Sequence, residues 1–181
     1  MACRQAREWR ERYSESPPLM GVNLSTDQLG QQSDAVSRVL LETGLDPGGL
    51  QLEITERPMM DDAEFALGEL RRLKSLGVRF AIDDYGMGYS CLYYLKRIPV
   101  DFLKIDRSFI AGLGKDPGDR AIVSGTIDLA HALGLKVVAE GVETADQLAE
   151  LKELGCDLAQ GFYLAEPLPG EAVSDLLSER R

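Results

Sequence analysis

The feature of this sequence that most limits its fold is a repeated local pattern, in which a helix ends in Leu-Gly and an apolar strand follows. The pattern occurs in three segments, Ser75–Asp83, Ala132–Glu140 and Glu153–Gln160. Each of the three strands ends in a polar residue. Regular alternation of helices and short apolar strands predicts an α/β fold, with parallel strands covered by helices. A barrel and a doubly wound sheet both satisfy this pattern.

Hydrophobic periodicity extends the alternation along the whole chain. The predicted strands are Leu19–Leu24, Leu50–Thr55, Val78–Asp83, Phe102–Ile105, Lys136–Glu140 and Cys156–Gln160. The predicted helices are Ala2–Tyr13, one within Ser33–Thr43, Ala63–Leu76, Leu92–Lys96, Arg120–Leu133, one opened by the capping box Thr144–Gln147, and one containing Ala172–Leu177. A length of 181 residues corresponds to about one domain.

Charge and cysteine usage exclude several classes of protein. The chain has 30 acidic and 20 basic residues, a formal net charge of −10, which argues against binding to a DNA or RNA polymer. No apolar run approaches the roughly 18 residues that cross a bilayer, and the charged N-terminus is not a signal peptide. Cys3, Cys91 and Cys156 lack CxxC spacing, so we expect reduced thiols in a cytoplasm.

Polar side chains interrupt the predicted strands at or near their C-terminal ends. These residues are Asn23, Glu53, Asp83, Asp84, Lys104, Glu140 and Gln160. The C-terminal ends of parallel strands lie on one face of a barrel, and ligands bind at the same end of a doubly wound sheet. The sequence therefore predicts a single site at this end of the strands.

The residue types at these positions indicate the chemistry of the site. One amide and several carboxylates supply oxygen ligands for Mg²⁺ or Mn²⁺. At a strand end, Asp83 and Asp84 can both face one site, and one of them can bridge two metals, an arrangement used in phosphodiester hydrolysis. Lys104 would then stabilise phosphate charge or orient water. Glu140 is placed for general-base or second-metal work.

Simpler interpretations exist for individual residues. A lone acid at a strand end is commonly a cap or a surface partner. Glu56 and Glu143 can be loop acids without a role, and Asn23 can satisfy a turn. The single histidine, His131, lies among Ala and Leu in a predicted helix, so a Ser-His-Asp triad is not supported. Residues Gly86–Gly88 do not complete a dinucleotide-binding fingerprint.

Five segments together resemble the EAL domain, a bacterial family that hydrolyses cyclic di-GMP. They are VNLS (Val22–Ser25), EITE (Glu53–Glu56), the long segment Asp83–Ile110, VVAEGVET (Val137–Thr144) and QGFYLAEPLP (Gln160–Pro169). The resemblance covers nearly the whole chain in the right order. It implies a modified TIM (β/α)8 barrel, two Mg²⁺ or Mn²⁺ ions, and linear pGpG as the product.

The resemblance also implies a role for each matching residue. The implied metal ligands are Asn23, Glu53 and Asp83, with Asp84 as a ligand of the second metal. The implied catalytic residues are Lys104, near the attacking water, and Glu140, as base or ligand. The implied supports of substrate or loop are Glu56, which steadies the loop after Asp84, together with Glu143 and Gln160. That loop is linked in the family to metal binding and dimerisation.

The sequence departs from the family pattern in three ways. It lacks the Glu-Ala-Leu signature, whose Glu is a metal ligand and would lie before Met1. Six strands are predicted where a TIM barrel has eight, so we expect residues 1–181 to be the C-terminal three quarters of a single EAL-like domain, without the first two strands. Met87 stands where the family usually has Thr, and Glu166 stands where a basic residue is common.

These departures leave two functions open. The first is a cyclic di-GMP phosphodiesterase, which we expect to be impaired in the 181-residue chain because one ligand is absent. The second is a catalytically silent module that binds cyclic di-GMP or another protein. An unrelated barrel metalloenzyme fits only if the resemblance is set aside. The implied partners are cyclic di-GMP, a second copy of the chain, and an upstream sensor or GGDEF domain.

Overall fold

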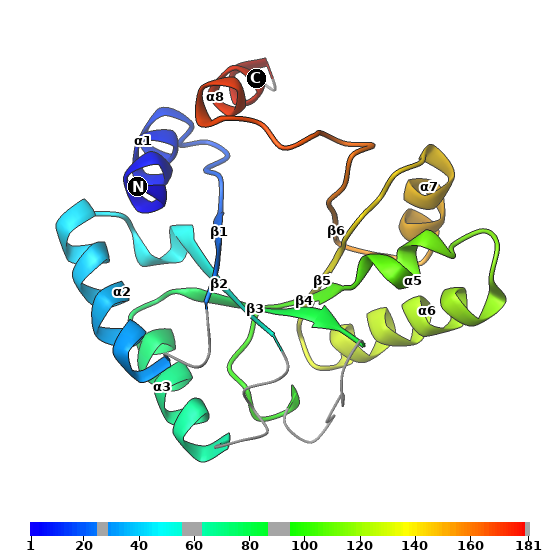
Figure 1. Ribbon diagram of the computed structural model, residues 1–181, viewed down its shortest axis with the longest axis horizontal. Helices are drawn as coiled ribbons and strands as arrows, with labels where there is room; N and C mark the ends of the chain where they lie inside the picture. Colours follow the sequence, from blue (N-terminus) through cyan, green and yellow to red (C-terminus); the bar gives the residue numbers. More distant parts are fainter. Residues whose placement is uncertain (25–28, 56–62, 87–94, 180–181) are drawn as a thin grey trace.

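The structure is a computed structural model that describes residues 1–24, 29–55, 63–86 and 95–179. Six strands form one parallel sheet, and their order in the sheet follows the sequence. They are β1 (Met20–Asn23), β2 (Leu50–Thr55), β3 (Arg79–Tyr85), β4 (Phe102–Ile105), β5 (Lys136–Ala139) and β6 (Leu158–Ala159). A doubly wound sheet would reverse its strand order at one point. The sequential order and the curl of the sheet in Figure 1 therefore define an open half-barrel of the TIM type.

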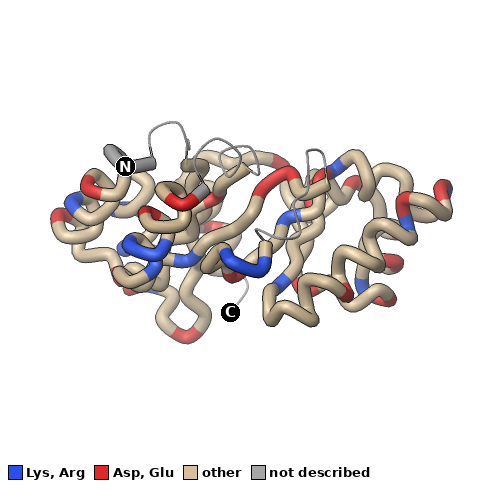
Figure 2. The backbone as a smooth tube through the Cα atoms, turned by 90° about the horizontal axis from the view of Figure 1, so that it is seen from below, with Lys and Arg blue, Asp and Glu red and all other residues tan. Residues whose placement is uncertain are grey.

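The helices lie on the outer side of the curved sheet (Figure 1). They are α1 (Ala2–Arg12), α2 (Leu29–Thr43), η2 (Pro47–Gly49), α3 (Ala63–Ser75), α5 (Arg107–Ala111), α6 (Pro117–Ala132), α7 (Ala145–Glu153) and α8 (Gly170–Glu179). The first and last helices meet, because Trp9 Nε1 donates a hydrogen bond of 2.8 Å to Ser174 Oγ. Figure 2 shows acidic and basic positions intermixed over the helices. Within the described ranges, no helix is both long and apolar enough to cross a membrane.

Most element boundaries agree with the sequence prediction, and the larger differences concern β3, β6 and the starts of two helices. β3 continues past its predicted end at Asp83 to Tyr85, while β6 is shorter than predicted. α6 begins before Arg120, because the Asp116 side chain accepts a hydrogen bond from the Gly118 amide and caps the helix. α5 was not predicted and is opened in the same way by Asp106. The predicted helix Leu92–Lys96 lies mainly outside the described residues.

Alternation along the strands separates two faces of the sheet. The outer face packs against the helices and forms the main core, with Ile54, Phe80 and Leu103 fully buried. The inner face carries a smaller apolar cluster of Ala81, Phe102 and Val138. Two residues further along each of those three strands, on the same face, are Asp83, Lys104 and Glu140. The curved sheet thus has an apolar layer directly beneath a charged one.

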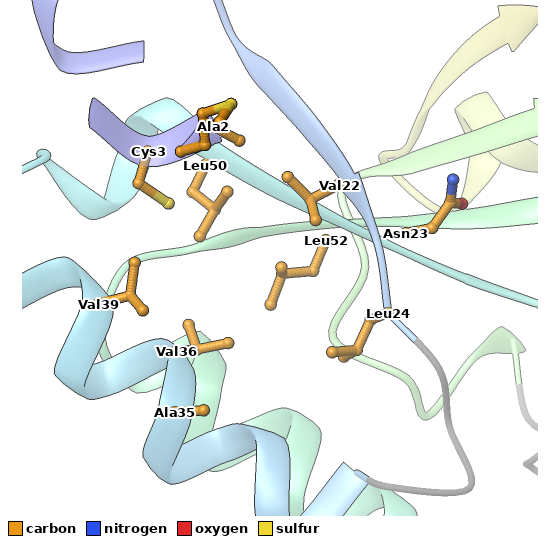
Figure 3. A pocket seen from close by; sticks show the side chains of 11 residues that line it. Ala2, Cys3, Val22, Asn23, Leu24, Ala35, Val36, Val39, Leu50 and Leu52 are labelled. Carbon is orange, nitrogen blue, oxygen red and sulfur yellow. The ribbon is translucent and has the colours of Figure 1, made fainter. Parts of the chain in front are cut away.

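An apolar pocket of about 290 Å³ lies between α1, α2 and the first two strands. Figure 3 shows Val22 and Leu24 turned toward this pocket, together with Leu52 of the next strand. Asn23 points away from these side chains (Figure 3). Asn23 therefore belongs to the inner face, the face that carries the charged layer.

Two of the three Leu-Gly segments, Ser75–Asp83 and Ala132–Glu140, make a similar contact with the start of the next strand, which we call the amino-end clamp. In the first clamp, Asp101 Oδ2, just before β4, accepts a hydrogen bond of 2.8 Å from the Phe80 amide of β3 and pairs with Lys74 at the end of α3. In the second, Asp157 Oδ2, just before β6, accepts a hydrogen bond of 2.9 Å from the Val137 amide of β5. In this second clamp, Asp157 Oδ2 also lies 2.8 Å from Nε2 of His131 at the end of α6.

Candidate active site

The charged layer is organised around one buried ammonium group. Lys104 Nζ lies 2.6 Å from Glu53 Oε2, 2.9 Å from Asp83 Oδ1 and 2.7 Å from Glu140 Oε1. The Lys104 side chain is 5% exposed, and the three carboxylate side chains are 14–17% exposed. The four residues come from β2, β3, β4 and the end of β5. The curl of the sheet brings together residues of strands that are not neighbours.

The electrostatics of the cluster follow from this packing. Burial alone would lower the pKa of Lys104, but its hydrogen bonds to the carboxylates of Glu140, Glu53 and Asp83 outweigh burial and raise the pKa above its ordinary value. Burial raises the pKa of Glu140, and the charges of Asp83 and Glu53 add to that effect against the opposing ammonium. One positive charge therefore faces several acids, which leaves the layer short of positive charge.

Asp84 joins the cluster because of an irregularity in β3. The register between β3 and β4 shifts between Ile82 and Tyr85, and Asp84 has a left-handed backbone with φ of 53°. Successive residues of a regular strand would point to opposite faces. Here carboxylate oxygens of Asp83, Asp84 and Glu140 can all lie within 4.8 Å of one another. The sequence prediction that both aspartates face one site is consistent with this geometry, although the cause is a bulge within the strand.

The donor set fits a divalent cation of the hard type. Burial raises the pKa of Asp84, and the negative charges of Asp83 and Asp106 raise it further. Carboxylates that are crowded together in this way repel one another until a cation compensates them. The Lys104 ammonium already serves as a cation for three of the acids. Oxygen-only donors of this kind suit Mg²⁺ and Mn²⁺.

Glu53 is held in place by two residues that were not predicted. Gln51, buried two residues earlier on β2, donates a hydrogen bond of 3.1 Å from Nε2 to Glu53 Oε1. Gly21 of β1 leaves room for the same carboxylate, because a Cβ atom there would lie 2.5 Å from Glu53 Oε1. Both precede a predicted site residue, Glu53 or Asn23, by two positions. Residues two positions apart on a strand point to the same face, so this spacing could have identified both as neighbours of the site.

The remaining predicted residues lie in three different places. Asn23 is level with Glu53 in the pairing of β1 with β2, and both are on the inner face. Glu143 and Gln160 are exposed and follow β5 and β6, and among the described residues neither takes part in the Lys104 ion pairs. Glu56 lies outside the described residues, as does Met87.

Comparison with known proteins gives this arrangement a family. The open half-barrel and the acidic cluster at the C-terminal ends of its parallel strands place this chain among α/β barrel proteins with a site suited to metal binding. The family model for the EAL domain matches residues 1–167. The chain therefore belongs to the EAL domain family.

Individual relatives agree with this assignment. The bifunctional diguanylate cyclase/cyclic di-GMP phosphodiesterase MucR of Pseudomonas aeruginosa is 46% identical over 174 residues, which are 95% of this chain and 25% of MucR. The solved PaMucR phosphodiesterase, a c-di-GMP complex, has a TM-score of 0.89 at 46% identity over 95% of this chain and 70% of that one. The chain thus spans about a quarter of the length of the curated relative.

Two further solved structures extend the likeness. The EAL domain of Mycobacterium smegmatis DcpA has a TM-score of 0.92 at 43% identity, with 99% of this chain and 82% of that chain covered. Klebsiella pneumoniae BlrP1, solved as a manganese/cy-diGMP complex, has a TM-score of 0.76 at 32% identity over 87% of this chain and 41% of that one. The half-barrel therefore has the fold of the corresponding part of solved EAL domains.

Proposed function

We propose that this chain is a metal-dependent phosphodiesterase domain that hydrolyses cyclic di-GMP to linear pGpG. The observation that carries the proposal is the cluster of Glu53, Asp83 and Glu140 around the Lys104 ammonium, beside Asp84. Membership of the EAL family and the likeness to the PaMucR c-di-GMP complex support the choice of substrate.

The metal site follows from the donor set. Asp83, Asp84 and Glu140 would hold one or both divalent cations, with Glu53 and Asn23 as further oxygen ligands on the same face. Mg²⁺ or Mn²⁺ is the proposed metal, and the manganese in the BlrP1 complex supports this choice. A divalent cation bound here polarises a phosphoryl oxygen and makes water more acidic.

The residues of the chain supply the other parts of the reaction. Lys104 is a fixed positive charge that can stabilise an oxygen on which negative charge develops, although its three N–H donors already face Glu53, Asp83 and Glu140. Glu140, whose pKa is raised chiefly by burial, can accept a proton from the attacking water. Gln160 and Glu143, whose side chains are exposed, are proposed to contact the substrate or support the loop, together with Glu56. The apolar layer beneath the cluster limits access of water from that side.

The test is to incubate the purified 181-residue chain with cyclic di-GMP and Mg²⁺ or Mn²⁺ and to detect pGpG by chromatography. Asp83→Asn should abolish turnover, whereas Asp34→Asn removes an exposed carboxylate on α2 and should leave it unchanged. We expect turnover to be low and to rise strongly when a strand carrying Glu-Ala-Leu is added at the amino end.

The results also distinguish the alternative function. Binding of cyclic di-GMP without hydrolysis in either form would refute the phosphodiesterase proposal and support a silent binding module. Equal turnover by both forms would show that the Glu-Ala-Leu segment is dispensable. A cytoplasmic site of action is also proposed, because Cys3 and Cys156 are free thiols. A second copy or an upstream sensor or GGDEF domain remains a proposed partner.

A further inference from the structure

Gln147, in the first turn of α7, makes three hydrogen bonds with its side-chain amide. Its Oε1 accepts hydrogen bonds of 2.8 Å from the Glu143 amide and 3.0 Å from the Thr144 amide. Its Nε2 donates a hydrogen bond of 3.1 Å to the carbonyl oxygen of Ile110. The residue is only 6% exposed. The capping box predicted at Thr144–Gln147 is confirmed, but it explains only part of these contacts.

The contact with Ile110 connects two segments that both follow site strands. Ile110 belongs to α5, which begins directly after β4, the strand of Lys104. Glu143 belongs to the segment 140–144 between β5 and α7, which begins with Glu140. The Gln147 amide thus ties the connection after β4, the strand of Lys104, to the connection after β5 that begins with Glu140.

The rest of segment 140–144 is also held by its backbone. The amide of Val142, which is fully buried, donates a hydrogen bond of 3.0 Å to the carbonyl of Gln160, and its carbonyl accepts one of 3.0 Å from the Tyr163 amide. Gly141 has a φ of 71°, and a Cβ atom there would lie 2.5 Å from Cβ of Arg107 in α5. The segment therefore sits directly against α5 on one side and against the segment after β6 on the other. Gln147 supplies the hydrogen bonds on the α5 side.

We propose that Gln147 is a positioning residue for the active site, because it fixes segment 140–144 and so directs the Glu140 carboxylate toward Lys104 and the metal ligands. This inference rests on the proposed function. Residues that orient a metal ligand contribute strongly to metal binding, since their loss typically weakens metal affinity about 10- to 100-fold. An error of about 1 Å in a catalytic group can cost roughly a hundredfold in rate.

Two substitutions separate the contacts of Gln147. Gln147→Glu keeps oxygens that can accept from the Glu143 and Thr144 amides, but it turns a carboxylate oxygen toward the Ile110 carbonyl and breaks the bridge to α5. Gln147→Met removes all three side-chain contacts. The matched control is Asp116→Ala, which removes a helix N-cap from α6 and leaves segment 140–144 untouched.

Three measurements on the 181-residue chain test the proposal. Hydrogen exchange of the Glu143 and Thr144 amides reports the contacts directly, and it should be at least about tenfold faster in Gln147→Met. Titration calorimetry with Mn²⁺ alone should show affinity weakened about tenfold or more in both Gln147 variants, and within twofold of the unsubstituted chain in Asp116→Ala. With cyclic di-GMP, kcat should fall more than KM rises.

The outcomes are distinguishable. Gln147 variants that bind Mn²⁺ as tightly as the unsubstituted chain would overturn the inference and leave Gln147 as a helix cap. Failure of both variants to fold would also overturn it, because Gln147 would then be a structural residue. An unsubstituted chain that binds no Mn²⁺ would instead overturn the proposed function.

Discussion

Replacing Lys104 with Met leaves three poorly exposed carboxylates facing one another without the ammonium that they share. Met keeps most of the aliphatic stem, so the change removes charge and hydrogen bonds with little change in packing. Lys104 is 5% exposed, and each of its partners lies within 2.9 Å of Nζ. Removal of one partner from a buried ion pair typically costs about 3–5 kcal/mol. We therefore expect the free energy of unfolding of Lys104→Met to fall by about 3–5 kcal/mol at pH 7.

The assay is urea-induced unfolding at pH 7 with a chelator present, with the slope of the transition checked for each variant. Lys74→Met is the matched control, since Lys74 pairs with the single carboxylate of Asp101 and both side chains are about a third exposed. Loss of that pair should cost no more than about 1 kcal/mol. Addition of Mn²⁺ should reduce the deficit of Lys104→Met, because a divalent cation replaces the missing charge.

The pH dependence has a definite sign. The pKa of Lys104 is raised in the folded chain. Its contribution to the free energy of unfolding is therefore complete below the ordinary lysine pKa and is lost only as the pH rises through the raised pKa. The difference between the two proteins should therefore be full at pH 7. A deficit below about 1 kcal/mol at pH 7 would refute the charge argument.

Four other outcomes are expected. Asp84→Asn should raise the melting temperature in chelator, because the pKa of Asp84 is raised and its ionised form therefore destabilises the folded chain at neutral pH. Calorimetry on the same variant should show Mn²⁺ affinity at least about tenfold weaker. Partial burial would raise the pKa of Asp157, but hydrogen bonds from His131 and the Val137 amide outweigh it and lower the pKa. Asp157→Asn should therefore lower the free energy of unfolding by about 1 kcal/mol at pH 7 and by little below pH 3, which urea unfolding at both pH values would measure. Gly21→Ala should weaken Mn²⁺ affinity by displacing the Glu53 carboxylate, and equal affinity would contradict this steric reading. The 181-residue chain should associate through the edges at β1 and β6, and light scattering from a stable monomer that binds no hydrophobic dye would contradict that expectation.

The sequence predicts those parts of the fold that depend on local hydrophobic pattern. β2 and β4 have their predicted bounds, because each is an apolar segment between clear turn signals. α5 spans only Arg107–Ala111, which is too short for a helical period to be visible. The extension of β3 through Asp84 depends on a register shift against β4, and no local pattern specifies such a shift.

The candidate site was predictable as a set of residues but not as an arrangement. Strand-end positions identified Glu53, Asp83 and Glu140, because polar residues in apolar segments stand out. That Lys104 contacts all three at once depends on the curl of the sheet, since β2 and β4 are separated by β3. Gln147 was visible only as half of a capping box, because its third contact is to Ile110, a residue distant in sequence.

The amino-end clamps have a consequence for how this half-barrel can change. Asp101 ties the end of α3 and the start of β3 to β4, and Asp157 ties the end of α6 and the start of β5 to β6. Both aspartates lie at the end of the sheet opposite the carboxylate cluster. These two clamps are therefore separate from the segments that carry chemistry, unlike the Gln147 contacts at the carboxyl end. A loop at the carboxyl ends can be exchanged for one of different length or charge while the amino-end clamps stay intact. The frame is thus suited to loop grafting, and the same separation allows new specificities to evolve without loss of the scaffold.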